Sequence, residues 1–394
     1  MTTTINNEHK KLNVPNLRFK EFQGEWEKTK IGDIAIVVGG GTPDTNTSQY
    51  WNGKIQWFTP SEIGRNKYVY NSVRTISEEG LNKSSAKLLP IGTILLSSRA
   101  TVGECSINKK ECTTNQGFQS LIPKENISNE FVYYLIQTKR KDLIRKSCGS
   151  TFLEISANEV RKIVVSIPTI KEQDKIAKLL SLLDDRIATQ NKIIEDLKKL
   201  KSAIIEKLYK EIQGTWYSYR QLFSIINERN KQLEYSNVLS ASQERGMVSR
   251  EDLNLDIHFE RSNISTYKIV KNGDYVIHLR SFQGGFAFSE KTGICSPAYT
   301  VLRPNNLLVY GYLSNYFTSR DFVKSLIIVT YGIRDGRTIN VDEWLDMKVV
   351  IPSKGQQTHI VNVIESIENK IKNEETYSNC LLNQKQYLLR QMFI

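Results

Sequence analysis

Two arginines stand at matching places in the chain and could read DNA bases. Arg99 and Arg280 each follow a short apolar run typical of a buried strand, and each precedes a glycine by four residues, Gly103 or Gly284. An arginine can donate two hydrogen bonds to guanine O6 and N7, and a glycine lets a backbone approach DNA closely. The pattern therefore predicts two base-reading arginines. An arginine that pairs with a carboxylate or holds a loop is the alternative, and it stays open.

Other polar residues extend this prediction. The candidates for base or phosphate contact near Arg99 are Ser97, Ser98, Thr101 and Gln116. Cations mixed with aromatic residues, as on surfaces that line a DNA groove, occur at Arg65, Lys67, Tyr68 and Tyr70, and two arginines flank Gly336 at Arg334 and Arg337. For each of these residues a solvated loop is the competing interpretation.

Catalytic motifs are missing from the sequence. There is no G-x-x-x-x-G-K-[ST] phosphate loop and no G-x-G-x-x-G fingerprint. Gly39-Gly40-Gly41-Thr42-Pro43 lacks the phosphate-loop lysine, and we interpret it as a tight turn after a strand at 34–38. No Asn-Pro-Pro-aromatic tetrapeptide occurs, and Pro43-Asp44 has no Asp/Glu-x-Lys after it in the same region. The chain is therefore predicted to bind and position DNA rather than to catalyse.

Composition agrees with a polyanionic partner. The 394 residues carry a net charge of +12 and a pI near 9.2, and fixed positive charge attracts phosphates. No run approaches the length of about 18 apolar residues that a membrane span needs, and residues 1–11 lack the apolar core of a signal peptide. Five cysteines without a C-x-x-C pair and four scattered histidines predict reduced thiols, no metal site and a cytoplasmic location.

The two halves of the chain repeat each other in one order. The matching segments are Gln23-Gly24-Glu25-Trp26 with Gln213-Gly214-Thr215-Trp216 at an offset of 190, 91–99 with 272–280 at an offset of 181, and 155–160 with 339–344 and Ile167-Pro168 with Ile351-Pro352 at an offset of 184. Chance would not keep one order and nearly one offset over so long a span, so the chain is a tandem duplication whose copies have diverged.

Each copy ends in a long heptad run. The first seam is Ile176, Leu180, Leu183, Ile187, Gln190, Ile194, Leu197, Lys201, Ile204 and Leu208. Its counterpart 184 residues later is Ile360, Ile364, Ile367, Ile371, Glu374, Ser378, Leu381, Lys385, Leu388 and Met392. Such a/d spacing is typical of a coiled coil. Because the first helix must end where the second globular region begins, we expect antiparallel pairing, with helices of about 60 Å that hold the globular regions at opposite ends of a rod.

The expected fold is mixed α+β with a pseudo-twofold repeat. Buried strands are predicted at 94–96, 163–167, 275–279 and 347–351, and short helices at 130–144 and 310–325. The predicted organisation is a disordered segment at 1–14, a globular region with a mixed sheet at 15–168, a long helix at 169–211, a second globular region at 212–352 and a second long helix at 353–394.

Several segments together resemble the specificity subunits of type I restriction–modification systems. They are Asn16-Leu17-Arg18-Phe19-Lys20-Glu21-Phe22 with Gly24 and Trp26, Gly40-Gly41-Thr42-Pro43, Tyr50-Trp51-Asn52-Gly53 with Ile55 and Trp57, Ser98-Arg99-Ala100-Thr101-Val102-Gly103, Thr114-Asn115-Gln116-Gly117-Phe118, and Ile167-Pro168 leading to Glu172-Gln173. The resemblance covers the chain from about residue 14 onward. The second copy lacks the G-G-T-P and Y-W-x-G segments and keeps Ser296-Pro297-Ala298-Tyr299, so the two halves resemble two different readers.

The resemblance implies a division of labour. Each globular region would be a target-recognition domain for one half of an asymmetric, interrupted site in double-stranded DNA, and the helix pair would set the gap. Two modification subunits that bind S-adenosylmethionine would dock on the helices, and restriction subunits would cut with ATP and Mg²⁺. This chain would bind no cofactor itself.

Three other interpretations remain. A standalone DNA-binding regulator would bind its site tightly without a partner. A coiled-coil scaffold without a DNA role would show no salt-sensitive DNA binding. A catalytic chain would act alone with metal or methyl donor.

Overall fold

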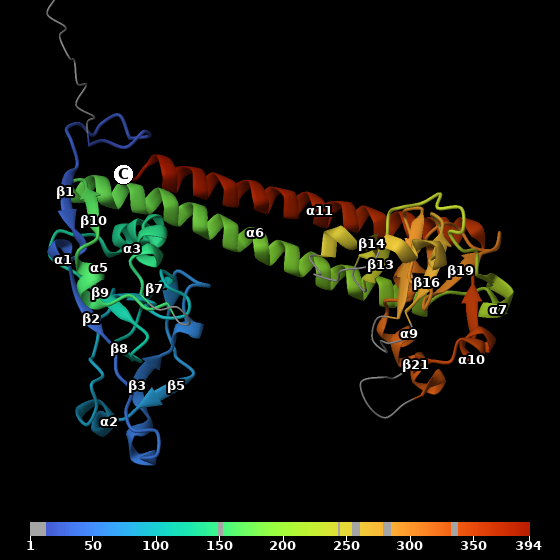
Figure 1. Ribbon diagram of the computed structural model, residues 1–394, viewed down its shortest axis with the longest axis horizontal. Coiled ribbons are helices and arrows are strands. Elements are labelled where there is room, and N and C mark those ends of the chain that lie inside the picture. The colour runs from blue at the N-terminus through green and yellow to red at the C-terminus, as the bar shows by residue number, and fades with distance from the viewer. Residues whose placement is uncertain (1–12, 149–152, 243–244, 254–260, 279–284, 332–337) are drawn as a thin grey trace, which may run out of the picture. The chain divides into compact units, whose positions relative to one another are not determined.

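Two units divide the chain, and each takes residues from both long helices. The computed structural model describes residues 13–148, 153–242, 245–253, 261–278, 285–331 and 338–394. Unit 1 comprises Met1–Thr189 and Tyr377–Ile394, and unit 2 comprises Gln190–Thr376 (Figure 1). Each unit therefore holds one globular region with one stretch of each long helix. This division differs from the predicted organisation, in which each helix was a segment of its own.

Unit 1 is built on two sheets. Across the larger sheet the strands run β2 (Ala35–Gly39), β9 (Gln119–Pro123), β6 (Ile94–Leu96), β7 (Cys105–Asn108) and β4 (Tyr68–Val69). The smaller sheet has β3 (Trp51–Phe58) in its centre, with β5 (Arg74–Ile76) antiparallel on one side and β8 (Cys112–Thr114) parallel on the other. The β4–β7 pair is parallel while the other pairs of the larger sheet are antiparallel, so the region is a mixed-sheet fold, as predicted.

Helices cover the sheets of unit 1 and connect them to the long helix. They are α1 (Ile31–Ile34), α2 (Glu78–Asn82), α3 (Asn129–Thr138), α4 (Arg140–Arg145) and α5 (Ala157–Arg161). Six consecutive residues of α3, from Phe131 to Ile136, are buried, because this helix lies inside the main core. The ribbon of β1 (Glu27–Lys30) and β10 (Val164–Ile167) then leads into the long helix α6 (Ile170–Lys210).

Unit 2 repeats the same order of strands. Its main sheet runs β12 (Phe223–Ile226), β19 (Thr300–Pro304), β16 (Tyr275–Ile277) and β17 (Phe286–Phe288). The ribbon of β11 (Thr215–Ser218) and β22 (Lys348–Ile351) leads into α11 (Lys354–Gln391). The short helices are α7 (Tyr219–Leu222), α8 (Tyr312–Tyr316), α9 (Arg320–Ser325) and α10 (Val341–Asp346). β6 and β16 differ by 181 residues and β10 and β22 by 184, which confirms the duplication.

The small strand pairs of unit 2 have no counterpart in the order of unit 1. They are β13 (Leu239–Ser242) with β14 (Gly246–Ser249), β15 (Lys268–Val270) with β18 (Gly293–Cys295), and β20 (Thr330–Tyr331) with β21 (Thr338–Ile339). The two units therefore share a main sheet and differ in what surrounds it.

One part of the sequence alignment is wrong. Lys28 pairs with Ser166 and Trp216 pairs with Val350, so the first strands of the two copies match at an offset of 188 instead of 190. Trp26 is 3% exposed, and its Nε1 donates to the buried carboxylate of Glu172 at 3.3 Å, whereas Trp216 is 64% exposed. The repeated tryptophans thus have different environments, because a strand turns successive side chains to opposite faces.

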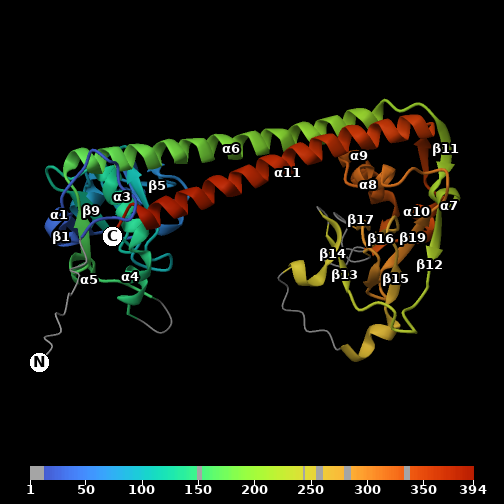
Figure 2. The same ribbon diagram turned by 90° about the horizontal axis from the view of Figure 1, so that it is seen from above.

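The heptad seams form an antiparallel helix pair within each unit. All twenty seam positions are buried or half-buried. In unit 1, Leu183 and Ile187 pack against Leu381. In unit 2, Gln190 donates to the main-chain oxygen of Glu374 at 3.2 Å and also to its carboxylate. Figures 1 and 2 show α6 and α11 side by side in each unit.

Lysines at the eighth seam place also repeat their role. Lys201 pairs with Glu368 at 2.6 Å in unit 2, and Lys385 pairs with Asp184 at 2.6 Å in unit 1. Adding 184 to Lys201 gives Lys385, and adding 184 to Asp184 gives Glu368, so the second ion pair is the symmetry-related copy of the first. The pairs fix the antiparallel register, as polar seam residues do in other coiled coils.

A buried glutamine fastens each long helix to its globular region. Gln173 accepts a hydrogen bond from the Ser128 amide at 2.9 Å and donates to the Pro168 carbonyl at 2.9 Å. Gln357 accepts from the Val309 amide at 2.8 Å and donates to the Pro352 carbonyl at 3.0 Å. Since buried main-chain groups need partners, each glutamine ties the first turn of its helix to a loop of the same unit.

The predicted elements lie close to the observed ones. Helices expected at 130–144 and 310–325 are each divided into two, α3 with α4 and α8 with α9. The long helices begin and end within three residues of 169–211 and 353–394. One strand expected to be buried is exposed at its first residue, Val164, because β10 lies in a two-stranded ribbon.

Candidate nucleic-acid interface

Three segments of unit 1 meet where β6 ends, and we call this place the recognition edge, defined by Thr42, Arg99, Thr101 and Gln116. Ser97 bridges to Phe118 in antiparallel register, which places Arg99 across from Gln116. The β2–β9 register, with Gly39 opposite Gln119, places Thr42 across from Gln116 as well, and the Thr42 hydroxyl donates to the Gln116 side chain. Residues 57 positions or more apart are thus gathered at one edge.

The glycine segment before Thr42 is not the predicted tight turn. The Gly41 amide donates to the Thr114 carbonyl at 2.8 Å, and a Cβ on Gly40 would lie 1.9 Å from the Asn115 carbonyl oxygen. Glycine is required here because the segment continues in close contact with Thr114 and Asn115 after β2 ends. The contact holds Thr42 at the recognition edge.

Arg99 has found a carboxylate partner within unit 1. Its side chain is 45% exposed, and Nε lies 2.9 Å from Oε1 of Glu154. Ala100 beside it has a φ of 57°, and the Thr101 amide donates to the Arg99 carbonyl at 2.6 Å, so the arginine stands on a sharp turn. The carboxylate pair is the alternative that the sequence left open, and base reading by Arg99 stays a prediction.

Three predicted contact residues near Arg99 are buried, which contradicts a direct contact with DNA. Ser97 and Ser98 are each 0% exposed, and the Ser97 hydroxyl donates to the Arg99 carbonyl at 2.9 Å. Gly103 has a φ of 88°, and a Cβ there would meet Cγ of Arg140 at 2.8 Å. These residues shape the turn, whereas Thr101 and Gln116 are exposed and remain candidates.

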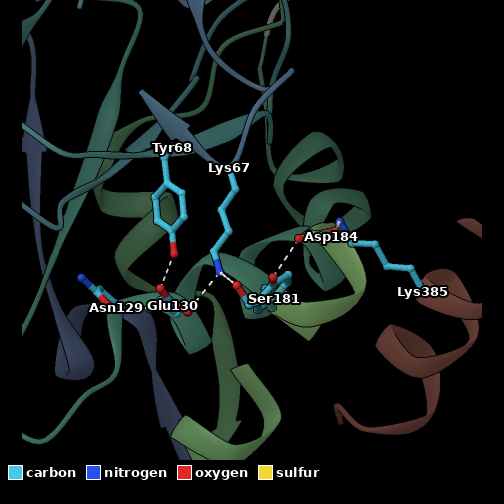
Figure 3. Close-up of polar contacts among 8 residues, drawn as sticks. Lys67, Tyr68, Asn129, Glu130, Ser181, Asp184 and Lys385 are labelled. Carbon is cyan, nitrogen blue, oxygen red and sulfur yellow. Dashed lines mark hydrogen bonds and ion pairs between the residues drawn. The ribbon is translucent and has the colours of Figure 1, made fainter. Parts of the chain in front are cut away.

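Lys67 and Tyr68 belong to a buried cluster and not to an open groove. Lys67 donates to Glu130 and to Ser181 at 3.0 Å each, and its side chain is only 8% exposed (Figure 3). Tyr68 donates to the other oxygen of Glu130. We call Lys67, Tyr68, Glu130 and Ser181 the Glu130 cluster. It joins β4, α3 and α6, so these two predictions of DNA contact are wrong.

Electrostatics support a structural role for this cluster. Burial acts to raise the pKa of Glu130, but hydrogen bonds from Tyr68 and Lys67 outweigh it and hold that pKa below its ordinary value. Burial, followed by the hydrogen bond to Glu130, raises the pKa of Tyr68. Glu130 therefore stays ionised between two donors that the sequence pattern did not link to it.

The remaining predicted site residues divide into two groups. Arg65 is exposed and follows Gly64, whose amide donates to the Ser106 hydroxyl at 3.0 Å, close to the base of the Arg99 turn. Arg280, Gly284, Arg334 and Arg337 lie outside the described residues. The prediction for the second unit therefore stays a prediction.

An aromatic platform in unit 1 escaped the prediction of site residues. Trp51 and Trp57 pack edge to face with ring centroids 5.0 Å apart, and the Arg74 guanidinium lies 3.6 Å from the Trp51 centroid. The Trp57 indole donates to the Gly41 carbonyl at 2.9 Å, so the platform supports the glycine segment of the recognition edge. The Y-W-x-G segment was the available signal, but nothing in it pointed to Arg74.

Two searches of the described residues gave no candidate. No helix among them is both long and apolar enough to cross a membrane. No three histidine, cysteine, aspartate or glutamate side chains in that part of the chain gather as they would around a metal ion.

Comparison with known proteins is consistent in one respect. Residues 23–199 match the family described as the type I restriction modification DNA specificity domain. The MjaIX specificity subunit of Methanocaldococcus jannaschii is 37% identical over 226 residues, which cover 56% of this chain and 49% of that protein. The EcoR124I/EcoR124II specificity subunit of Escherichia coli is 29% identical over 237 residues, which cover 58% and 57%. The match thus spans about half the length of these curated relatives.

Solved structures share the fold of almost the whole chain. The S subunit of a type I restriction–modification system from M. genitalium is 15% identical with a TM-score of 0.53, and the comparison covers 97% of this chain and 99% of that one. A structure described as the basis of complex assembly and conformational transition of the type I R-M system is 14% identical with a TM-score of 0.62, covering 92% and 96%.

Proposed function

We propose that this chain, whose residues 23–199 belong to the type I restriction modification DNA specificity domain family, selects the DNA sequence on which a type I restriction–modification complex acts. The observation that carries the proposal is the duplication. Two units share a main sheet and a helix attachment, and their surrounding strands differ. Such a chain suits an asymmetric DNA site with two different halves.

The mechanism assigns one half-site to each unit. The recognition edge of unit 1 would face the bases of its half, and the net charge of +12 would favour association with phosphates. We assign the gap between the halves to the helices, because α6 is a single helix that begins in unit 1 and ends in unit 2. Half-site spacing follows protein geometry in the same way in other DNA-binding proteins.

Catalysis would belong to partner subunits. Two modification subunits would bind S-adenosylmethionine and methylate an adenine in each half, and restriction subunits would use ATP and Mg²⁺ to cut unmethylated DNA. In this proposal the chain binds none of these cofactors, works in the cytoplasm and supplies only sequence choice and assembly.

Methylation mapping tests the proposal. Single-molecule sequencing of a host that makes the modification subunit, with and without this chain, should reveal methyl-adenine at one interrupted motif only when both proteins are present. Methylation that is independent of the chain, or no motif with a modification subunit shown to be competent, would favour the standalone regulator instead.

A further inference from the structure

Arg74 is held flat against an indole ring. It is the first residue of β5, its side chain is exposed, and its guanidinium carbon lies 3.6 Å from the centroid of Trp51 and 5.3 Å from that of Trp57. A guanidinium is planar and stacks on aromatic faces, which leaves its N–H edge free for hydrogen bonds. The stack therefore fixes the direction of the edge without using its donors.

The indole rings beneath Arg74 are themselves fixed. Trp51 is 9% exposed and its Nε1 donates to the Asp44 carbonyl at 3.0 Å. Trp57 is 4% exposed and its Nε1 donates to the Gly41 carbonyl at 2.9 Å. Turning either ring would break a buried hydrogen bond, so the platform holds Arg74 in one orientation and lowers the entropy that binding would cost it.

The donors of Arg74 have no protein acceptor among the described residues. Other arginines of unit 1 are occupied: Arg99 by Glu154 at 2.9 Å and Arg140 by Glu104 at 2.8 Å. Within the described ranges, the contacts of the Arg74 side chain are the two indole rings. A guanidinium carries five N–H donors and is always charged, so a stacked and unpaired one is prepared for an acceptor outside the chain.

The platform connects Arg74 to the recognition edge. Arg74 pairs with Trp57 in β3, and the next β3 residue, Phe58, pairs with Thr114 in β8. Asn115 and Gln116 follow directly, and the Asn115 amide donates to the Phe58 carbonyl at 3.0 Å. On its other side the platform holds residues 41–44, which include Thr42. The indoles that orient Arg74 thus also support two segments of that edge.

A neighbouring residue favours a groove over the phosphate backbone. Val73 is 87% exposed although it is apolar, and its amide is held by Glu62 at 2.7 Å. Apolar side chains suit base edges such as the thymine methyl group, whereas phosphate contacts require only charge.

We propose that Arg74 is a sequence-determining residue that donates two hydrogen bonds to O6 and N7 of a guanine in the half-site read by unit 1. The proposal rests on the proposed function and deepens it. β5, β3 and β8 form a sheet that has no counterpart in unit 2, so the proposed guanine contact belongs to one half-site only.

The test uses the full chain with its modification subunit. Motifs are mapped by methylation sequencing for the natural chain and for Arg74→Ala, Arg74→Lys and Arg145→Ala. Arg145 is an exposed arginine of α4 that pairs with Asp142, and it serves as the matched control. Competition binding then compares duplexes in which each G·C pair of the motif is replaced in turn, including replacement of guanine by 7-deazaguanine, which lacks N7.

We expect Arg74→Ala to relax one G·C position in one half-site, with discrimination there falling by about 5-fold to 150-fold, and the other half-site to be unchanged. Arg74→Lys should relax the same position, because an ammonium lacks the planar fork. The 7-deazaguanine penalty at that position should disappear in both variants. Arg145→Ala should keep the natural motif.

Two results would overturn the inference. One is an unchanged motif and affinity in Arg74→Ala. The other is an equal loss for all duplexes that Arg74→Lys restores, since that describes a phosphate contact. If either variant methylates no DNA, the competition assay decides by the same criteria. A natural chain that directs no motif at all would instead count against the proposed function, so the two failures can be told apart.

Discussion

Units 1 and 2 use different side chains to build the same main sheet. In unit 2, Tyr219 and Trp344 stack with centroids 4.3 Å apart in the centre of the core, and both are fully buried or nearly so. The positions that match them in unit 1, at offsets of 188 and 184, are Ile31 and Val160, each 0% exposed. One copy fills its core with stacked rings and the other with aliphatic side chains, so burial at these positions is shared although the residue type is not.

The attachments between sheet and helix are shared, and the outer parts are not. Gln173 and Gln357 make matching hydrogen bonds, and Lys385 and Lys201 make matching ion pairs. The Trp51 platform occurs in unit 1 alone among the described residues, and unit 2 has three separate strand pairs instead. Divergence after the duplication is thus concentrated away from the helices, as two different DNA half-sites would require.

Replacing the ring at the centre of unit 2 should have the largest effect. Trp344→Ala should destabilise unit 2 by about 3–5 kcal/mol, because it removes a large buried side chain and leaves a cavity. Val160→Ala at the matching place should cost unit 1 clearly less, since fewer buried atoms are lost. Hydrogen exchange of amides in β22 and β10 measures each unit separately. Equal protection losses would contradict the different core construction.

Arg99 and its partner sharpen the comparison of exposed parts. If Arg99 reads a base, Arg99→Ala should lower discrimination at one position by about 5-fold to 150-fold, in the same half-site that Arg74→Ala alters. Glu154→Ala should keep the motif, because it only frees the guanidinium. Methylation mapping provides the readout. An unchanged motif in Arg99→Ala, with equal destabilisation by both variants, would make the pair structural.

The Glu130 cluster should give unit 1 a pH dependence that unit 2 lacks. At the matching position of unit 2, 181 residues later, stands Gly311. Glu130→Gln should cost unit 1 about 1.5–3 kcal/mol at pH 7, the usual value for hydrogen bonds to a charged group.

The sign of that dependence follows from the pKa. Because the pKa of Glu130 is lower in the folded chain than its ordinary value, its stabilising contribution is fully present above the unfolded pKa of about 4.3. The contribution is lost as pH falls through the folded pKa. Chemical denaturation at pH 7 and pH 3 should show the difference between Glu130→Gln and the natural chain shrink on acidification. A constant difference would show that charge is not the cause.

The two symmetry-related ion pairs should differ slightly. Asp184 and Lys385 are each 19% exposed, and Asp184 also accepts from the Tyr134 hydroxyl at 2.7 Å, whereas Glu368 in the other pair is 42% exposed. Lys385→Met should therefore cost about 1 kcal/mol more than Lys201→Met, because exposed pairs contribute little. Thermal unfolding at low and high salt measures both. The reverse order would mean that exposure does not decide their strength.

Periodicity predicted what depends on local spacing. All seam positions from Ile176 to Met392 avoid full exposure, and β6 has the predicted bounds. The two-residue alignment error at Trp216 arose because a matching tetrapeptide says nothing about strand register, and only the pairing with Val350 reveals it.

The candidate site was harder to predict because burial of polar residues depends on tertiary contacts. Lys67 and Ser97 have the composition of a DNA surface, yet Glu130 and the Arg99 turn enclose them. The position of Thr42 beside Gln116 follows from the β2–β9 register, which the spacing of 74 residues does not show. Arg74 looks like any exposed arginine until Trp51 is placed beneath it.

The central claim is that two different readers, one in each unit, recognise one DNA site. The most direct test is selection from a pool of random duplexes by the full chain with its modification subunit. The account predicts two different short motifs separated by a fixed number of unspecified base pairs. A single uninterrupted motif, two identical half-sites, or a variable gap would contradict it.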